Sequence, residues 1–385
     1  MTDTGVSQGE SMTFTFFYVG KGDCTLVEFP SGRLFGVIDS HKPRWHRRCP
    51  AAEALEESVR KAKESNSLGD AALEVAFICV SHPHYDHVHC LSDVLSVKQV
   101  RIREVWHTLP DLAKILLMNR PGTTEYINVL AEVSRVYQED QIEEFVEFVR
   151  KARETVGEDN IRQVMGFNIV PDIEGVQVYI LNPTDLALGP FRKAIKKYLR
   201  GLRLPTKELF DALSLAVLFV YGDNALLYAS DMQGDRWVEV MGDITQRETL
   251  KHHLPAIRVI KASHHGGCRS FYKDLWTEVL GTSNGDGRVI VSGGDPSHPH
   301  ETFIDSVLAA RKTLYCTGYG DKCALNVGTS DHFKFQVERL MKHYGARVGS
   351  SKFRPCCGDI RVVLPRQGLP QIIPDAPRMA GSCCA

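Results

Sequence analysis

An apolar run over residues 75–80 predicts a buried β-strand, and three histidines and an aspartate follow it within one short turn. The cluster consists of His82, His84, Asp86 and His87. Because a buried strand is rigid, a loop at its end can direct several side chains towards one point. Imidazole nitrogens and carboxylate oxygens that converge in this way suit a zinc-class divalent ion. The cluster therefore predicts a metal site, and polar loop residues without a ligand are the alternative.

The spacing of this cluster fits two divalent metal ions better than one. We expect His82 and His84 to bind one ion, and Asp86 and His87 to bind a second ion about 3.5 Å away, as in other two-metal sites. Zinc is the expected metal, with manganese as the alternative. Such ions lower the pKa of bound water from about 15.7 towards about 7, and Asp86 would act in catalysis by orienting the resulting hydroxide. The cluster therefore predicts a hydrolase.

Composition places the chain among ordinary globular proteins. Its 385 residues suffice for one large or two ordinary domains, and 43% are hydrophobic and 24% charged. The net charge of -1 gives no overall attraction to nucleic acid, so such binding would need a local patch. No N-terminal stretch resembles a signal peptide, and no apolar run approaches the roughly 18 residues of a membrane span. With 11 irregularly spaced cysteines, these features predict a cytoplasmic protein with mostly reduced thiols and no membrane partner.

Strand and helix signals are mixed along the chain, and several predicted strands end in His or Asp. We expect strands near 13–19, 24–29, 34–38, 75–80, 100–106, 176–181, 213–220, 225–229, 257–262, 289–292 and 360–364. We expect helices near 51–65, 270–280, 302–311 and 331–344. The pattern predicts a mixed α/β fold whose strand-end loops carry the site.

The segment 110–169 differs from its surroundings because apolar residues recur at helical spacing, for example at Ile142, Phe145 and Val149. We interpret it as a helical insertion that forms a packing layer, with a lid over the site as the alternative. The expected catalytic domain spans 12–330, and 331–385 forms a C-terminal extension and tail.

With these features in place, the chain resembles the metallo-β-lactamase-fold superfamily, because the cluster at 82–87 matches the signature of that superfamily. Further stretches resemble the branch of bacterial competence (DNA-uptake) proteins and phosphorylcholine-esterase-like phosphodiesterases. They are Gly20-Lys21-Gly22-Asp23-Cys24, Pro30-Ser31-Gly32, Ile38-Asp39, Leu213-Ser214, Ala229-Ser230-Asp231, Ser263-His264-His265-Gly266-Gly267 and His298-Pro299. The resemblance covers about 12–325 outside the insertion. It implies a four-layer αββα sandwich with the site along the edge between the two sheets.

The resemblance also implies roles for residues far from the cluster. Asp231 would bridge both ions, with one carboxylate oxygen on each. His298 would complete the second metal site, with His300 as the alternative. His264 and His265 would act in catalysis, with His264 preferred as the group that donates a proton to the leaving alkoxide. Metal ligation is the alternative role for this histidine pair.

Some positions depart from the family's pattern. Asn182 stands where many relatives have a histidine that binds the first metal. His89 and Cys90 stand where the family usually has two glycines that let a helix approach the metal loop, so the local packing must differ. Asp39 is expected to brace the metal loop by hydrogen bonding.

A basic segment bears on the substrate, because seven Lys and Arg residues follow one another without an intervening acid. They are Arg192, Lys193, Lys196, Lys197, Arg200, Arg203 and Lys207. They could contact the phosphate backbone of a nucleic acid, and a solvated helix face is the alternative. Together with the resemblance, the segment predicts a metal-dependent phosphodiesterase or nuclease.

Two other functions stay open at this point. One is hydrolysis of a small carbonyl substrate such as a lactone, thioester or β-lactam, which would not depend on salt. The other is a non-catalytic, metal-binding partner of another bacterial protein, suggested by the absence of a histidine at 182 and by the helical insertion.

Overall fold

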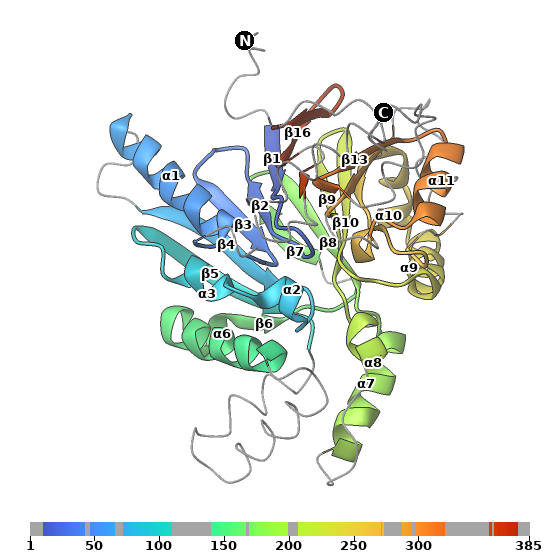
Figure 1. The fold of residues 1–385 in the computed structure, drawn as a ribbon, viewed down its shortest axis with the longest axis horizontal. Coiled ribbons are helices and arrows are strands. Elements are labelled where there is room, and N and C mark those ends of the chain that lie inside the picture. Colours follow the sequence, from blue (N-terminus) through green and yellow to red (C-terminus); the bar gives the residue numbers. More distant parts are fainter. Residues whose placement is uncertain are drawn as a thin grey trace, which may run out of the picture.

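Two mixed β-sheets face each other, and helices cover the outer side of each (Figure 1). This computed structural model describes residues 11–42, 47–65, 72–109, 140–166, 169–198, 207–270, 272, 287–293, 298–319, 354–355 and 358–375. The arrangement confirms the expected α/β class and its four αββα layers.

The first sheet comprises eight strands within the described residues. They are β1 (Ser11–Phe16), β2 (Thr25–Glu28), β3 (Leu34–Ile38), β4 (Leu73–Val80), β5 (Val100–His107), β6 (Ile161–Gln163), β16 (Ile360–Pro365) and β17 (Gln371–Pro374). Their order is β17-β16-β1-β2-β3-β4-β5-β6, antiparallel from β17 to β3 and parallel from β3 to β6. As its apolar sequence predicts, β4 is buried at all but one position.

The second sheet comprises seven strands within the same described ranges. They are β7 (Ile169–Ile173), β8 (Val176–Asn182), β9 (Ala216–Tyr221), β10 (Asn224–Ala229), β11 (Ile257–Lys261), β12 (Arg288–Val291) and β13 (Thr313–Cys316). Their order is β13-β12-β11-β10-β9-β8-β7, and the strands from β10 to β13 are parallel. The strands expected near 213–220 and 225–229 are β9 and β10, which pair antiparallel and are buried at every position because both faces of the sheet are covered. A separate pair joins β14 (Gly318–Tyr319) to β15 (Arg354–Pro355).

Helices lie on both outer faces and at one end of the molecule (Figure 1). The first sheet is covered by α1 (Pro50–Glu64), α2 (Tyr85–Val88), α3 (Leu91–Leu95) and α6 (Asp140–Val156). The second sheet is covered by α9 (Gly234–Gln246), α10 (Glu248–Lys251) and α11 (Glu301–Ala309). The end of the molecule carries α7 (Asp185–Tyr198) and α8 (Lys207–Asp211). Among the described residues, no helix combines the length and the apolar character that crossing a bilayer requires.

The core forms two hydrophobic clusters. The larger cluster includes the space between the sheets, where the rings of Phe14 on β1 and Phe219 on β9 lie 5.1 Å apart between centroids. The second cluster joins the outer face of the first sheet to its helices through residues such as Leu55 and Phe145. Full burial of a side chain of this size contributes about 1.5–3 kcal/mol to folding. The two clusters therefore hold β4, whose end carries the metal loop, and its neighbour β3 from both faces.

The predicted insertion and C-terminal extension are described in part. Helix α6 confirms the helix expected from the spacing at 142–149. The insertion also contains a strand, β6, which the helical periodicity did not predict. This strand forms by pairing in parallel with β5, a contact between separate parts of the chain. The rest of the predicted insertion before residue 140, and the predicted helices at 270–280 and 331–344, lie outside the described residues apart from 270 and 272. Strand β16 confirms the strand expected near 360–364 and pairs with β1. The domain boundary at 330 stays a prediction.

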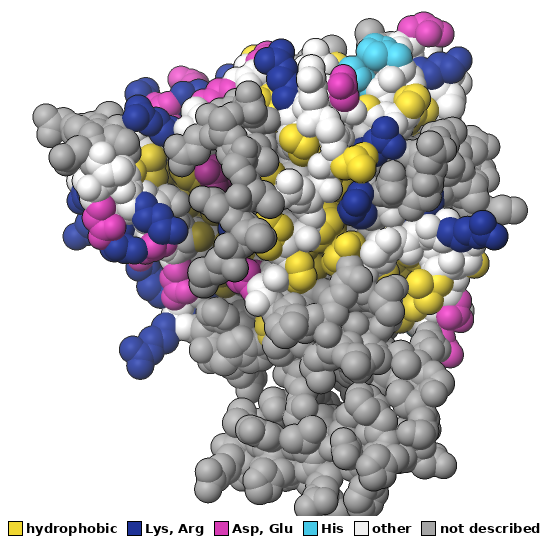
Figure 2. Space-filling view, turned by 90° about the horizontal axis from the view of Figure 1, so that it is seen from above, with side chains coloured by type: hydrophobic (Ala, Val, Ile, Leu, Met, Phe, Trp, Pro, Cys, Tyr) yellow, Lys and Arg dark blue, Asp and Glu magenta, His cyan; other side chains and the backbone are white. Residues whose placement is uncertain are grey.

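Surface charge is mixed on the face opposite α7. In Figure 2 the described Lys and Arg side chains of this face are scattered, with Asp and Glu among them. Apolar side chains are visible between them. This face therefore offers no concentrated positive patch among its described residues.

Candidate metal centre

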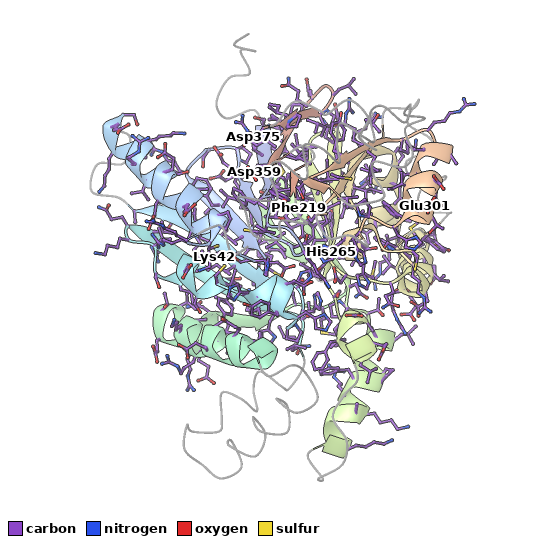
Figure 3. All side chains as sticks on the ribbon, in the orientation of Figure 1. Lys42, Phe219, His265, Glu301, Asp359 and Asp375 are labelled. Carbon is purple, nitrogen blue, oxygen red and sulfur yellow. The ribbon has the colours of Figure 1, made fainter. Side chains whose placement is uncertain are left out.

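The predicted metal loop connects β4 to α2 and is buried. His82 and His87 are fully buried and His84 is 4% exposed. Strands β3 and β4 are parallel, as are β10 and β11, so their carboxyl-terminal loops can gather at one edge of each sheet. Figure 3 shows His265, which follows β11, between the two halves of the molecule. The loops of both sheets therefore supply side chains to one centre.

Asp231, after β10, lies at the middle of this centre. Its Oδ2 is 3.8 Å from Nε2 of His82 and 3.4 Å from Nε2 of His87. Its Oδ1 is 3.6 Å from Nε2 of His265. Two ligand atoms bound to one ion at about 2.1 Å lie roughly 3 to 4 Å apart. These separations are therefore compatible with ligands that share an ion.

The donor atoms fall into two groups that could each hold a metal ion. Within each group the atoms lie within 4.8 Å of one another. The first group is His82, His84 and Asp231, and the second is Asp23, His87, Asp231 and His265. Asp231 belongs to both groups, so its geometry agrees with the expected bridging position. The individual ligand roles stay predictions.

Asp23 belongs to the second donor group by distance, but its negative charge is already paired with a buried ammonium. Its Oδ2 accepts a hydrogen bond from Nζ of Lys261 at 2.5 Å, and both side chains are fully buried. It also lies on the outer side of the imidazoles, with Oδ2 3.7 Å from Nδ1 of His87. Burial raises the pKa of Asp23, but the positive charges of Lys261, His265 and His87 together outweigh it and leave the pKa below its ordinary value. Asp23 is therefore a carboxylate of the second donor group that is paired with a buried ammonium.

Hydrogen bonds behind the centre orient two of the imidazoles. Nδ1 of His87 lies 2.8 Å from Oδ2 of Asp39, and Nδ1 of His265 lies 3.0 Å from the carbonyl oxygen of Ser292. Both acceptors require a proton on Nδ1, which leaves the electron pair of each Nε2 facing Asp231. The two imidazoles are therefore held in the tautomer that can bind a metal.

Buried polar atoms show that a cation fits here. Among the described residues, Nε2 of His87, Nε2 of His265 and Oδ1 of Asp231 are buried without a hydrogen-bond partner. Leaving such an atom unsatisfied costs about 1–3 kcal/mol. One divalent ion between these atoms would satisfy all three. The residues present therefore suit a metal ion.

The charges of the centre compete for protons when no ion is bound. Burial lowers the pKa of His87, but the carboxylates of Asp231 and Asp39 outweigh it and leave the pKa well above its ordinary value. Burial raises the pKa of Asp231, but His87 and His265 outweigh it and leave the pKa well below its ordinary value. A bound divalent ion would take the place of these protons as the positive charge.

Asp39 has the bracing role that the sequence predicted. Besides the bond from His87, its carboxylate accepts hydrogen bonds from the Ser81 amide at 2.8 Å and the Ser81 hydroxyl at 2.6 Å. Ser230, next to Asp231, donates to Asp39 at 3.3 Å. Asp39 therefore ties the metal loop to the strand end that carries the shared carboxylate.

The other predicted site residues differ in their distance from the centre. Asp86 lies at its rim, with Oδ2 3.7 Å from Nε2 of His265 and 21% of its side chain exposed. His264 and His298 stack on each other with ring centroids 5.9 Å apart, and neither belongs to a donor group among the described residues. His300 caps α11, where its Nδ1 accepts the amide of Thr302 at 3.3 Å.

The structure thus brings His265 to Asp231, and His298 lies one ring further out, with its centroid 6.1 Å from that of His265. The roles predicted for His264, His265 and His298 stay predictions, but the geometry favours His265 over His298 as the last imidazole of the second group. Both His264 and His265 have a positive φ, and their ring centroids lie 6.4 Å apart, which the sequence did not indicate.

Several residues of the centre were not singled out by sequence. Asp23 stands in a turn that packs against the metal loop, because Gly22 has no side chain to meet the Asp86 carbonyl oxygen. Lys261 ends a strand that is otherwise apolar apart from Arg258, and this was a usable signal of a buried charge. Asp211 ends α8 beside His84, and nothing in its local sequence marks it.

Cys90 stands in a backbone conformation that usually favours glycine, and its side chain packs in a buried cluster. Cys90 adopts the left-handed conformation, with φ 63 and ψ 11, at the start of α3. An L-residue there costs about 1–2 kcal/mol relative to glycine. The thiol of Cys90 lies 3.3 Å from the Ser40 hydroxyl, which also lies 2.9 Å from the Cys49 thiol. The space around position 90 is therefore filled by a buried cysteine and serine cluster.

Comparisons with known proteins found similar folds only among solved structures. No family model and no curated protein matches the chain. A CmlA beta-hydroxylase is 12% identical with a TM-score of 0.38, and the match covers 79% of this chain and 52% of that one, about half its length. The metallo-beta-lactamase fold protein YhfI from Bacillus subtilis is 6% identical with a TM-score of 0.38, covering 80% and 96%. A diphosphatase from the PhnP family is 9% identical with a TM-score of 0.31, covering 80% and 85%.

Imidazoles and carboxylates from both sheets thus meet at one buried point, and a rim residue is accessible to solvent. The donors can hold divalent ions, and their outer hydrogen bonds fix their orientation. With a divalent ion bound, these residues could support the hydrolysis of a substrate.

Proposed function

We propose that the protein is a metal-dependent phosphodiesterase that acts on phosphodiesters, including those of nucleic acid. The observation that carries the proposal is the pair of donor groups that share Asp231. Bound divalent ions would supply an acidified water molecule and positive charge for a phosphoryl oxygen. Asp86 stands at the exposed rim, where its carboxylate can accept a proton or orient the water.

Helix α7, which carries the described part of the basic segment, connects to the metal loop through two ring contacts. The ring of Phe191 on α7 lies 5.3 Å from that of Phe210 on α8, between centroids. The ring of Phe210 lies 6.5 Å from that of His84. Helix α7 is therefore anchored beside the first donor group, and a charged substrate bound along it would reach the metal loop.

The described basic side chains of α7 face solvent. Arg192, Lys193 and Lys197 are exposed, and the side chains of Lys196, Arg200, Arg203 and Lys207 lie outside the described part. Exposed cations next to a buried anionic centre would bind the phosphates that flank the scissile bond. The face opposite α7 has only scattered charges (Figure 2), so it does not compete with α7 for this contact.

The test is turnover of bis-p-nitrophenyl phosphate and of single-stranded DNA with Zn²⁺ or Mn²⁺. We expect turnover by the wild type and a loss of at least about 100-fold in Asp231→Ala and His82→Ala, since each removes a donor. Cleavage by these variants at the wild-type rate, or no cleavage with any metal, would reject the proposal. Turnover of a lactone or thioester without turnover of phosphodiesters would favour the carbonyl hydrolase instead.

The role of α7 is tested separately with Arg192→Gln/Lys193→Gln/Lys197→Gln. We expect weaker DNA binding and a smaller salt dependence, by roughly one in log–log slope for each phosphate that the helix no longer binds. Turnover of bis-p-nitrophenyl phosphate should not change, because this small substrate does not reach α7. An unchanged salt dependence would remove α7 from the substrate site.

A further inference from the structure

Three cysteines meet around the start of α3, just after the metal loop and outside both donor groups. The Sγ atom of Cys49 lies 2.9 Å from Oγ of Ser40, and the Sγ atom of Cys90 lies 3.3 Å from the same oxygen. The Cys49 thiol also forms side-chain hydrogen bonds with the thiols of Cys24 and Cys90. All three cysteines are free, and only Cys90 is more than 1% exposed, at 8%. They therefore form one buried thiol cluster at the base of the metal loop.

Cys49 is the member of this cluster that is placed to lose its proton. It immediately precedes α1, a helix of 15 residues, and the amino-terminal end of a helix favours negative charge. Burial raises the pKa of Cys49, but hydrogen bonds from Cys24, Cys90 and Ser40 outweigh it and leave the pKa well below its ordinary value. The thiolate is the nucleophilic form of cysteine. Cys49 is therefore the reactive thiol, and its neighbours are the thiols that it can meet.

Cys90 is better placed than Cys24 to pair with Cys49. A disulfide holds its sulfur atoms about 2.05 Å apart, closer than any hydrogen bond does, so one partner must move. Cys24 directly precedes β2, and its carbonyl oxygen accepts the amide of Phe17 at 3.0 Å, which holds it in the first sheet. Cys90 lies in the connection between α2 and α3, in a left-handed conformation that strains an L-residue. A small movement is therefore less costly at Cys90.

We propose that Cys49 and Cys90 are a peroxide-sensitive pair of thiols that closes to a disulfide. The Cys49 thiolate attacks one oxygen of hydrogen peroxide, so that an S–O bond forms, the O–O bond breaks and hydroxide leaves. The sulfur loses two electrons and the peroxide gains them. The sulfur of Cys90 then attacks the sulfenic acid, the S–O bond breaks, and the hydroxyl leaves as water with the Cys90 proton. A small peroxide suits this site because the cluster is buried apart from the slight exposure of Cys90.

The cluster is joined to the metal loop through Ser40. The amide of Ser40 donates to the carbonyl oxygen of His87 at 2.8 Å, and the preceding residue, Asp39, lies 2.8 Å from Nδ1 of the same histidine. A disulfide would replace the contacts of both thiols with the Ser40 hydroxyl and would draw Cys90 towards α1. Oxidation should therefore displace His87 and weaken metal binding. This inference does not depend on the choice of a phosphodiester substrate.

The first experiment maps the disulfide in the full-length protein. The metal-free wild type is treated with hydrogen peroxide, alkylated, digested with trypsin and analysed by mass spectrometry. We expect a bond between Cys49 and Cys90 that dithiothreitol reverses, with fragment ions separating Cys90 from Cys79, which lies in the same tryptic peptide. Cys90→Ser should lack this bond, and Cys268→Ser, which removes an exposed thiol, should form it as the wild type does. Alkylation of both cysteines after oxidation, or a bond from Cys49 to Cys24, would overturn the proposal.

The second experiment measures Zn²⁺ affinity by competition with a chromogenic chelator after the peroxide has been removed. We expect affinity to fall at least threefold on oxidation of the wild type and to return with dithiothreitol, and we expect no such change in Cys90→Ser. If Cys90→Ser does not fold, the wild type before and after dithiothreitol still provides the comparison. A disulfide without any change in affinity would refute the link to the metal loop. A protein that shows this disulfide but cleaves no phosphodiester when reduced refutes the proposed function alone.

Discussion

Asp39 lies behind His87, with its Oδ2 2.8 Å from Nδ1 of that histidine, and both side chains are fully buried. Asp39 is itself fixed by two hydrogen bonds from Ser81, the first residue of the metal loop. The pair couples the orientation of an imidazole that faces Asp231 to the backbone of the loop. A carboxylate in this position also raises the basicity of the imidazole that it contacts.

We therefore predict that Asp39→Asn weakens metal binding by about 10- to 100-fold, as is usual when a carboxylate behind a metal-binding histidine is removed. The asparagine keeps the shape but loses the charge that favours a proton on Nδ1. Calorimetric titration with Zn²⁺ measures the change. Asp172→Asn, an exposed change on β7, is the control. Equal affinity in Asp39→Asn and the wild type would show that His87 needs no such partner.

The competition between His265 and His298 can be decided by counting ions. Because Nε2 of His265 is 3.6 Å from Asp231, whereas His298 lies outside both donor groups, we expect His265→Ala to lose one ion per chain. His298→Ala should keep both ions. Metal content after dialysis is the measurement for both variants. The reverse result would restore His298 as the ligand that the sequence suggested.

The buried pair of Lys261 and Asp23 should contribute strongly to stability, because either charge alone would be buried without compensation. We predict that Lys261→Met lowers the free energy of unfolding by about 3–5 kcal/mol. Adding Asp23→Asn to that variant should restore at least half of the loss. Urea unfolding of the two single variants and the double variant gives the coupling. Additive losses would mean that the pair does not interact.

Stability should fall on acidification because of a buried, neutral histidine. Burial lowers the pKa of His107 from 6.5 to about 4. Between these values the unfolded chain binds a proton that the folded chain does not, so the stabilisation is complete above pH 6.5 and is lost as the pH falls towards 4. At about 1.4 kcal/mol for each pKa unit, the loss is at most about 3 kcal/mol.

The histidine-specific part of this loss is the difference between the wild type and His107→Gln, which cannot titrate. Urea unfolding of both proteins at pH 7.5, 6 and 5 measures it. We expect the wild type to lose more stability than His107→Gln over this range. Parallel losses in the two proteins would assign the acid sensitivity to other groups.

Local features of the fold and the site were predictable from sequence because neighbours in the chain determine them. The apolar run that forms β4 and the His82–His87 cluster are adjacent in the chain, so the sequence alone predicted a buried strand that ends in a metal loop. The β9–β10 hairpin was marked by Gly222, which has a positive φ of 58 in the turn. Short-range signals of this kind predict strands and the loops at their ends.

The rest of the centre depends on contacts between distant residues, which no local pattern encodes. Lys261 meets Asp23 across 238 positions, and their separate sequences resemble an ordinary strand end and an ordinary turn. Asp211 lies at the end of α8, and Asn182 on β8 fixes the segment that follows it. The contact between Asp211 and His84 therefore depends on how these segments pack. His264 and His265 are neighbours with positive φ at both, and only His265 joins a donor group among the described residues, which their sequence does not reveal.

We propose, as the central claim, that two divalent ions share the carboxylate of Asp231. Anomalous diffraction at the zinc absorption edge, from crystals grown with Zn²⁺, tests it most directly. The account predicts two peaks, one on each side of the Asp231 carboxylate, with His82 and His84 at the first and His87 and His265 at the second. Absence of both peaks, or a single peak out of contact with Asp231, would contradict it.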